Sequence, residues 1–213
     1  MGFKALRFDE RGVKAARQHH LLKGKKMLGR GTFAAVYEGT REDTVLKLTV
    51  DEKNYWMHND GYCRVRHQHF PRTVANEGEI GTTRIAGREF GLYLFELERL
   101  HKLRRGGSAK KLAAQICEVE ESTTGTARGA DWVNAGDTYR KLAGMATSTA
   151  LPPSVCAALD ELADFTANVE GCAVDMHSQN FMERDDGTLV MSDPILDVNV
   201  WGAAQSQVVS RGW

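Results

Sequence analysis

A strand–turn–strand pattern near the end of the chain constrains the fold more than any other feature. Residues 181–183 and 189–191 are short runs with strand-forming residues, and residues 185–187 between them read Asp-Asp-Gly, a typical turn. Two strands joined by so short a turn pair as a hairpin, which returns the chain to its starting point. We therefore expect Asp193 to lie beside Asn180.

Three polar side chains would gather at the open end of this hairpin. Asp175 precedes Asn180 by a few residues, and Asp193 follows the second strand. An Asp and an Asn that converge offer the hard oxygen ligands that Mg²⁺ prefers, and a separate carboxylate can orient a hydroxyl and accept its proton. Alternatively, Asp175 caps a turn and Asp193 opens a loop before Pro194. The pattern predicts Asn180 and Asp193 as metal ligands and Asp175 as a catalytic residue.

A glycine-rich turn lies in the first half of the chain. Gly29 and Gly31 stand one residue apart, after a predicted strand at residues 25–28 and before another at residues 34–38. Such glycines let backbone N–H groups close over phosphate oxygens, although a plain hairpin turn has the same sequence character.

The next predicted strand, residues 44–48, carries a lysine among apolar residues. Lys47 stands in the sequence Val-Leu-Lys-Leu. A buried ammonium group needs an anionic partner, because leaving it unpaired is expensive, and the phosphates of ATP would supply one. A lysine on an edge strand that faces water is the alternative.

The remaining pattern predicts strands followed by helices. Residues 79–85 and 89–95 form a predicted hairpin, and residues 52–66 form a weak helix that an Asn-Asp-Gly sequence interrupts. Helices are expected from Ser108, with apolar residues at helical spacing, and from Pro153.

This order of elements predicts an α+β fold with two lobes. Residues 1–98 would form a lobe with a five-stranded sheet, one helix and the glycine-rich turn. Residues 99–213 would form a reduced helical lobe that carries Asp175 and the hairpin. The Gly- and Thr-rich stretch at residues 120–129 is predicted to be a mobile loop.

Charge and composition exclude several classes of protein. Lys plus Arg and Asp plus Glu both number 28, so the net charge indicates no strongly basic or acidic partner. The basic stretch at residues 102–111 is short, and a solvated surface is a simpler interpretation than nucleic-acid binding. Cys63, His67 and His69 are metal-ligand types without a second pair, which favours a surface helix end. The four cysteines lack CxxC spacing and the N-terminus lacks a long apolar run, so we expect reduced thiols, a cytoplasmic protein and no membrane segment.

The glycine-rich turn, the strand lysine, the Asp-x-x-x-x-Asn loop and the later Asp occur in the order of the protein-kinase signature. The chain therefore resembles the protein-kinase-like fold over about residues 23–197. Within that fold it is similar to the early serine/threonine protein kinases of T-seven-like short-tailed bacteriophages. The sequence blocks that carry this resemblance are Lys26-Met27-Leu28-Gly29, Gly31, Phe33, Tyr62-Cys63-Arg64, Asp175-Met176-His177-Ser178, Asn180 and Asp193-Pro194.

The resemblance implies a kinase that uses ATP and Mg²⁺ and phosphorylates host bacterial proteins early in infection. Its substrates would include transcription or RNA-processing machinery in the host cell cytoplasm. It implies no direct contact with nucleic acid and none with a membrane, and it leaves an oligomer open.

The resemblance also implies roles for single residues. Gly29 and Gly31 would cover the phosphates, and Lys47 would hold the α- and β-phosphates. Asp175 would be the catalytic Asp, with Asn180 and Asp193 as the Mg²⁺ ligands.

The adenine would bind at a hinge between the lobes. Residues 95–98 would follow the fifth strand as this hinge, where backbone groups of Glu96 and Glu98 pair with the base. Val36 completes the candidate nucleotide site.

Several positions depart from the kinase pattern. Ala34 replaces the third glycine, Ala173 and Val174 stand where the pattern has His and Arg, and Pro194 follows the metal Asp. No helical Glu is an obvious partner for Lys47, and Glu52 is the best candidate. Few residues follow the metal Asp, so we expect substrate to be held elsewhere, by the insertion at residues 103–148 or by an oligomeric partner.

Two other interpretations stay open. The Asp-Met-His-x-x-Asn sequence is similar to the loop of aminoglycoside and choline kinases, which would make the chain a small-molecule phosphotransferase. Those enzymes need a long helical lobe after the metal Asp, and we expect no such lobe from the few residues that follow Asp193 here. Alternatively, the chain is a catalytically idle, kinase-shaped protein that binds and inhibits a host factor.

Overall fold

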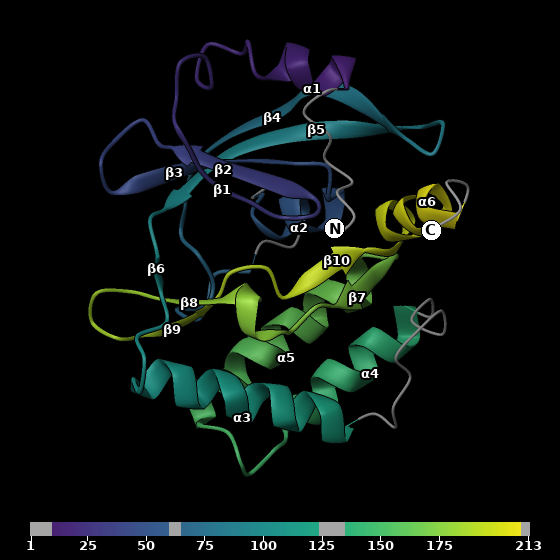
Figure 1. Cartoon of the computed structure of the whole chain (residues 1–213). Helices are drawn as coiled ribbons and strands as arrows, with labels where there is room; N and C mark the ends of the chain where they lie inside the picture. Colours follow the sequence, from purple (N-terminus) through teal and green to yellow (C-terminus); the bar gives the residue numbers. More distant parts are fainter. Residues whose placement is uncertain (1–9, 60–64, 124–134, 210–213) are drawn as a thin grey trace. The chain divides into compact units, whose positions relative to one another are not determined.

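The computed structural model of the chain describes residues 10–59, 65–123 and 135–209 (Figure 1). These residues form an α+β structure that divides into two compact units. The first unit contains residues 10–55, 73–99 and 199–209, and the second contains residues 56–59, 65–72, 100–123 and 135–198. The division at residue 99 lies next to the predicted one, but two segments differ. Residues 56–59 and 65–72 belong to the second unit, and the described segment from Asn199 belongs to the first.

A five-stranded antiparallel sheet forms the centre of the first unit, in the order β1-β2-β3-β5-β4. The predicted sheet is therefore present, although β4 and β5 extend over 13 and 11 residues and exceed their predicted lengths. Its strands are β1 (Met27–Arg30), β2 (Ala34–Glu38), β3 (Thr44–Thr49), β4 (Thr73–Ile85) and β5 (Arg88–Glu98).

The predicted hairpin between β4 and β5 is confirmed and has a two-residue turn. Ile85 pairs with Arg88, and the residues between them, Ala86 and Gly87, have φ angles of 49° and 81°. Positive φ at both positions is the geometry of a type I′ turn, which matches the twist of paired strands. Gly87 adopts a positive φ without steric cost, whereas the Cβ atom of Ala86 makes a positive φ unfavourable.

Two helices pack with the sheet in the core of the first unit. These are α1 (Arg11–Ala16) and α6 (Val198–Val209), and the sequence pattern predicted neither. Val13 of α1 and Val200 of α6 are fully buried in the same apolar cluster as Leu46 and Leu94 of the sheet. The segment after the predicted metal Asp therefore completes the core of the first unit.

Glu10 fixes α1 to the sheet. Its carboxylate accepts hydrogen bonds from the N–H groups of Gly12 (2.8 Å) and Val13 (3.2 Å) and from the hydroxyl of Thr83 on β4 (2.7 Å). A Cβ atom on Gly12 would lie 1.8 Å from the carbonyl oxygen of Thr82, so only glycine allows this approach. The helix is thus held by an N-cap that also reaches the neighbouring strand.

Helix α2 (Glu52–Met57) is much shorter than the predicted helix over residues 52–66. Asp51 caps its start, because its carboxylate accepts from the N–H of Asn54 (2.9 Å). Residues 60–64, which include most of the Asn-Asp-Gly interruption, lie outside the described residues.

Three helices and several short strands form the second unit. The predicted helices from Ser108 and Pro153 are confirmed, as is the predicted hairpin of residues 181–191, whereas α4 had no counterpart in the prediction. Helix α3 extends to Thr123, and the rest of the predicted loop at residues 120–129 lies outside the described residues. The elements are β6 (His101–Lys102), α3 (Ser108–Thr123), α4 (Ala135–Ala146), α5 (Pro153–Asn168), β7 (Cys172–Val174), the 3₁₀ helix η2 (Ser178–Asn180), β8 (Phe181–Glu183), β9 (Leu189–Met191) and β10 (Ile195–Asp197).

The core of the second unit joins these helices to the strands. Strand β10 pairs with β7, and β6, β8 and β9 form a three-stranded sheet. Helix α5 contributes the largest share of the buried side chains, and apolar residues of β7, β8 and β9 pack in the same cluster. The helices thereby hold the loop between β7 and β8 in place.

Hydrogen bonds of His69 attach the segment at residues 65–70 to the β8–β9 hairpin. The ring of His69 bonds through Nδ1 to the carbonyl oxygen of Leu189 (2.7 Å) and through Nε2 to the hydroxyl of Ser154 (3.1 Å). Burial lowers the pKa of His69, which keeps the ring neutral. Both ring nitrogens serve the fold, which argues against a zinc ligand here; Cys63 lies outside the described residues.

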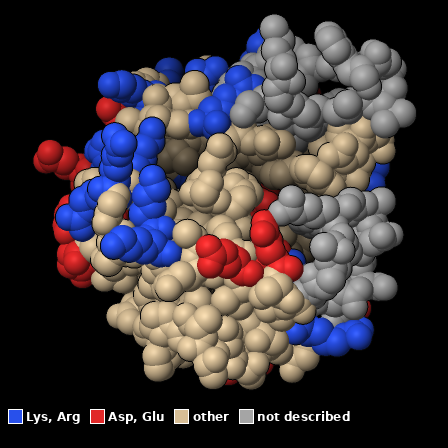
Figure 2. All heavy atoms as spheres, turned by 60° about the horizontal axis from the view of Figure 1, so that its bottom comes forward, with Lys and Arg blue, Asp and Glu red and all other residues tan. Residues whose placement is uncertain are grey.

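Exposed cationic side chains gather at β6 and the first turn of α3. Figure 2 shows Lys and Arg side chains at the left of the view, where these two elements lie in Figure 1. We call this group the basic strip; its members are Lys102, Arg104, Arg105, Lys110 and Lys111.

Among the residues that the structure describes, no helix combines the length and the apolar character that crossing a membrane requires.

The predicted hinge at residues 95–98 is wrong, because these residues belong to β5. Strand β5 runs to Glu98 and lies between β3 and β4, so Glu96 pairs with Leu46 on one side and with Ala75 on the other. The backbone groups of Glu96 therefore serve the sheet.

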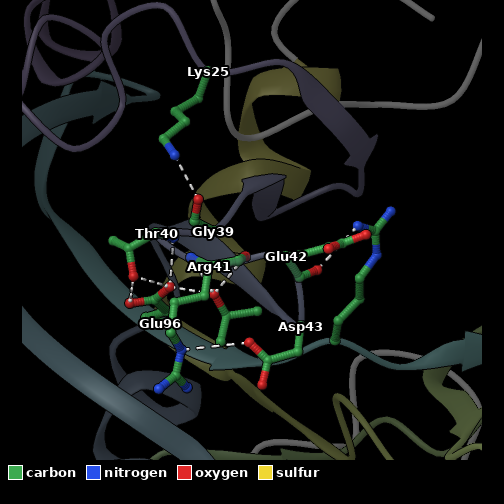
Figure 3. A network of polar contacts seen from close by, with 9 residues as sticks. Lys25, Gly39, Thr40, Arg41, Glu42, Asp43 and Glu96 are labelled. Carbon is green, nitrogen blue, oxygen red and sulfur yellow. Dashed lines mark hydrogen bonds and ion pairs between the residues drawn. The ribbon is translucent and has the colours of Figure 1, made fainter.

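The side chain of Glu96 holds the turn between β2 and β3 (Figure 3). Its buried carboxylate accepts hydrogen bonds from the Thr40 N–H (2.6 Å), the Thr40 hydroxyl (2.7 Å) and the Thr44 hydroxyl. Lys25 donates to the carbonyl oxygen of Gly39 in the same turn (2.5 Å). Burial alone would raise the pKa of Glu96, but the hydrogen bonds from Thr44 and Thr40 outweigh it and lower the pKa below its usual value.

We predict a pH-dependent loss of stability for Glu96→Gln. Because the folded-state pKa lies below the unfolded one, the ionised carboxylate stabilises the fold above the unfolded pKa, and this contribution is lost as the pH falls through the folded pKa. Urea unfolding should show a loss of about 1–3 kcal/mol at pH 7 and a smaller difference below about pH 4. The exposed Glu77→Gln is the matched control. An equal loss at both pH values would contradict the argument.

Candidate active site

Asp175, Asn180 and Asp193 lie close together in the second unit. Val174, the last residue of β7, pairs with Ile195 of β10, and the Asp175 N–H donates to the carbonyl oxygen of Pro194 (2.8 Å). Asp175 and Asp193 therefore stand at adjoining ends of two paired strands.

The predicted hairpin brings Asn180 to the same place. Phe181 of β8 pairs with Met191 of β9, and Ser192 closes the open end. Its N–H and its hydroxyl both donate to the carbonyl oxygen of Asn180, at 2.8 Å and 3.0 Å. The residue before Asp193 is thus fixed to Asn180, as the turn sequence predicted.

Asn180 and His177 flank the carboxylate of Asp175. The Asn180 side-chain Nδ2 donates to the Asp175 carbonyl oxygen (2.7 Å) and to Oδ2 (3.0 Å). The His177 Nε2 lies 3.6 Å from Oδ1, and the His177 side chain is half exposed. The sequence pattern did not assign a role to His177; its place two residues after Asp175, on the same short loop, is the signal that could have found it.

Burial raises the pKa of the Asp175 carboxyl above its usual value. His177 lowers this pKa, while the neighbouring carboxylate of Asp193 raises it further. A carboxylate with a raised pKa holds a proton more strongly, which suits a group that accepts a proton from a hydroxyl.

Asn180 and Asp193 offer donors that fit a divalent cation. Because Nδ2 of Asn180 is used on Asp175, the amide oxygen Oδ1 is the group left to bind a cation, beside the half-buried carboxylate of Asp193. Across the described residues, no three His, Cys, Asp or Glu side chains form a complete metal site. A Mg²⁺ ion typically binds through one or two protein ligands and takes the others from water and phosphates, so this pair suits it.

The candidate residues of the first unit form a row across the sheet. Gly29 pairs with Val36, Val36 with Lys47, and Lys47 with Phe95. Paired residues of antiparallel strands point to the same face, so Val36, Lys47 and Phe95 lie side by side. Leu46 and Leu48 alternate to the other face, where they join the apolar core.

Lys47 lies on the central strand β3 and is 6% exposed, which excludes the water-facing edge-strand alternative. Its ammonium group donates to the side-chain oxygen Oδ1 of Asn54 on α2 (2.7 Å) and lies 5.9 Å from the centre of the Phe95 ring. Glu52, the predicted partner, instead accepts from the hydroxyl of Tyr93 (2.8 Å). The helical residue that binds Lys47 is thus Asn54, which the expectation of an acidic partner missed.

The glycine-rich turn is fixed at its tip and open at its first glycine. The carbonyl oxygen of Phe33 accepts from the Val50 N–H (3.0 Å), and the Phe33 ring packs edge-on against Trp201 of α6 (6.1 Å between ring centres). A Cβ atom on Gly29 would meet nothing within 4 Å, so packing within the described residues does not require glycine there. The bare glycine leaves space beside its own backbone, whereas the Gly31 N–H donates to the carbonyl oxygen of Ala34 (2.8 Å).

Glu96 and Glu98 were predicted to bind the nucleotide through backbone groups of a hinge, and this prediction no longer holds. Both are buried within β5, where Glu98 pairs with Thr44 of β3. The other predicted residues, Gly29, Gly31, Val36 and Lys47 in the first unit and Asp175, Asn180 and Asp193 in the second, stay candidates.

No protein-family model matches the chain, and no curated protein matches its sequence.

We predict strong coupling between Lys47 and Asn54. A hydrogen bond to a charged group contributes about 1.5–3 kcal/mol, so a double-mutant cycle with Lys47→Met and Asn54→Leu should give a coupling energy in that range in urea unfolding. The pair Lys47→Met and Glu52→Gln is the control cycle and should give a smaller coupling. A larger coupling to Glu52 would show that Glu52, not Asn54, is the partner.

We also predict that Asp175→Asn raises stability. At neutral pH the half-buried carboxylate feels the charge of Asp193, and both burial and this neighbour make its own charge unfavourable. An Asn side chain keeps an oxygen for Asn180 and removes the charge. In Mg²⁺-free buffer at pH 7, the thermal midpoint should rise by a few degrees. Asp160→Asn, on the exposed face of α5, should leave it unchanged; a fall with Asp175→Asn would contradict the argument.

Proposed function

We propose that the chain is a protein kinase that transfers the γ-phosphate of ATP to Ser or Thr hydroxyls of proteins. The observation that carries this proposal is the convergence of Asp175, Asn180 and Asp193. Two backbone contacts, from Asp175 to Pro194 and from Ser192 to Asn180, hold them together. A catalytic carboxylate beside an Asn–Asp metal pair is the arrangement that phosphoryl transfer to a hydroxyl requires.

In this proposal the second unit performs the proton and metal chemistry. Asp175 orients the acceptor hydroxyl and takes its proton, and Asn180 positions the Asp175 carboxylate through Nδ2. Oδ1 of Asn180 and the carboxylate of Asp193 would hold Mg²⁺, which when bound neutralises charge on the phosphate oxygens.

The first unit would bind the nucleotide. Lys47 would hold the α- and β-phosphates, and the N–H groups near Gly29 and Gly31 would cover them. Val36, beside Lys47 on the same face, would contact the adenine. We also propose that the five-stranded sheet corresponds to the small lobe of a protein-kinase-like fold. Its support is the position of the glycine-rich turn between the first two strands and of the lysine on the third.

The biological assignment rests on the phage-kinase resemblance. We propose that the substrates are proteins of a bacterial host, including transcription or RNA-processing machinery, and that the chain acts in the host cytoplasm. The resemblance, carried by blocks such as Asp175–Asn180, is the support for this part of the proposal.

One observation favours a second candidate, a catalytically idle protein that binds a host factor. The helical partner of Lys47 is the neutral Asn54. Active kinases pair this lysine with a Glu on the helix, whereas Glu52 of α2 accepts from the Tyr93 hydroxyl.

Phosphate transfer distinguishes the two candidates. The protein is incubated with Mg²⁺, labelled ATP and bacterial lysate, beside Asp175→Asn, Lys47→Met and the control Asp160→Asn. We expect labelled lysate proteins with the native chain and the control, and a loss of about 10²–10⁴-fold with Asp175→Asn, the range for removing a general base. No label with the native chain, together with equal capture of lysate proteins by the native chain and Asp175→Asn, would instead support the idle binder.

Nucleotide binding is measured separately from transfer. Mg-ATP should raise the thermal midpoint of the native chain, and Asp193→Asn should remove most of this rise. Without nucleotide, the midpoint of Asp193→Asn should not fall below that of the native chain. An undiminished rise with Asp193→Asn would contradict the metal role of Asp193.

A further inference from the structure

The basic strip lies next to the predicted catalytic loop within the second unit. Lys102 of β6 pairs with Met182 of β8, which follows Asn180 by two residues. Helix α3, which carries Lys110 and Lys111, packs against η2 and β8, and the Cys117 thiol donates to the carbonyl oxygen of Met176 (3.6 Å). The strip and the loop therefore belong to one packed structure.

Some cationic groups in and beside the basic strip already contact carboxylates of the protein. Arg104 donates to the buried carboxylate of Glu183, and Nε2 of His101 lies 3.0 Å from Oδ1 of the exposed Asp185. The other members of the strip have no acidic partner among the described residues. These cations are Lys102, Arg105, Lys110 and Lys111.

Four exposed cations beside one another repel, and an anionic partner would relieve this repulsion. The partial positive charge at the start of α3 adds to theirs, because Lys110 and Lys111 lie in its first turn. The electrostatics of the strip therefore favour contact with negative charge.

The chemistry around the strip favours an acidic protein segment over a nucleic acid. Residues 100–111 contain no Phe, Tyr or Trp on which a base could stack. The whole chain has a formal net charge of zero, so it has no overall attraction for a polyanion. The exposed Asp185 and Asp186 in the turn after β8 would repel a continuous phosphate backbone, whereas a short acidic segment can end before them.

We propose that the basic strip binds an acidic segment of the protein substrate, so that the chain prefers Ser or Thr hydroxyls flanked by Asp and Glu. This inference rests on the proposed kinase function and names its substrate class. The strip provides positive charge in the same unit as Asp175. Most of its residues lie in the insertion at residues 103–148, which the sequence analysis named, beside an oligomeric partner, as a place where substrate could be held.

Direct binding tests the strip without catalysis. Fluorescence anisotropy without ATP compares a labelled Ser peptide flanked by Glu and Asp with the same peptide flanked by Lys. The proteins are the native chain, Lys110→Glu/Lys111→Glu, and the matched control Lys14→Glu/Lys23→Glu, which has the same charge change on exposed residues of the first unit. We expect the acidic peptide to bind the native chain and the control, and the strip variant to bind it about tenfold or more weakly. Added salt should weaken the native binding.

Phosphorylation of the same peptides gives the second readout, as kcat/KM with Mg-ATP. The native chain should prefer the acidic peptide, and the strip variant should lose this preference while Mg-ATP still raises its thermal midpoint. Binding that depends on the strip without transfer to any peptide would support the docking surface and count against the kinase. Equal transfer to both peptides, unchanged in the strip variant, would overturn the docking surface and leave the kinase standing.

Two other results would also overturn the inference. One is the absence of acidic-peptide binding and of any acidic preference in the native chain. The other is tighter binding of a single-stranded or duplex RNA of equal charge, lost in the strip variant, which would assign the surface to nucleic acid.

Discussion

The pairing of β7 with β10 is the contact on which the candidate active site depends. Each strand has only three residues, yet their ladder, extended by the bond from Asp175 to Pro194, brings Asp175 and Asp193 close enough for one carboxylate to raise the pKa of the other. Carboxylates that repel each other do not approach without support, and here backbone hydrogen bonds provide it. Pro194 adds rigidity, because its ring fixes its own φ while its carbonyl oxygen stays available as the acceptor.

Neutral dipoles contact the charged groups of Glu96, Lys47 and Asp175, each of which is buried or half-buried. Glu96 accepts from two threonines, Lys47 donates to Asn54, and Asp175 accepts from Asn180. The outcome differs with the surroundings. The hydrogen bonds to Glu96 outweigh its burial and lower its pKa, whereas burial and a neighbouring carboxylate raise the pKa of Asp175. The first carboxylate stabilises the fold, and the second keeps a proton affinity that suits chemistry.

Local signals predicted the elements that depend on neighbouring residues. The hairpin of residues 181–191 and the starts of α3 and α5 follow from turn residues, proline and helical spacing, all of which act over a few positions. The same approach missed α4 and α6, and the kinase resemblance placed a hinge at residues 95–98, where β5 continues. Residues far away in sequence decide that case: Thr40 and Thr44 satisfy Glu96, so a charged residue can lie inside a central strand.

The sequence by itself determined that Asp175, Asn180 and Asp193 belong to one loop and one hairpin, because the two strands of a hairpin bring its ends together. It also determined that Lys47 lies on a strand after a glycine-rich turn. Only the tertiary structure decided that Asn54, and not Glu52, receives the Lys47 ammonium group. It also decided that the segment from Asn199 joins the core of the first unit. The first depends on how α2 is placed against β3, although Lys47 and Asn54 are only seven residues apart, and the second depends on packing between segments distant in the chain. In both cases burial and hydrogen-bond geometry, and not local pattern, choose the partner.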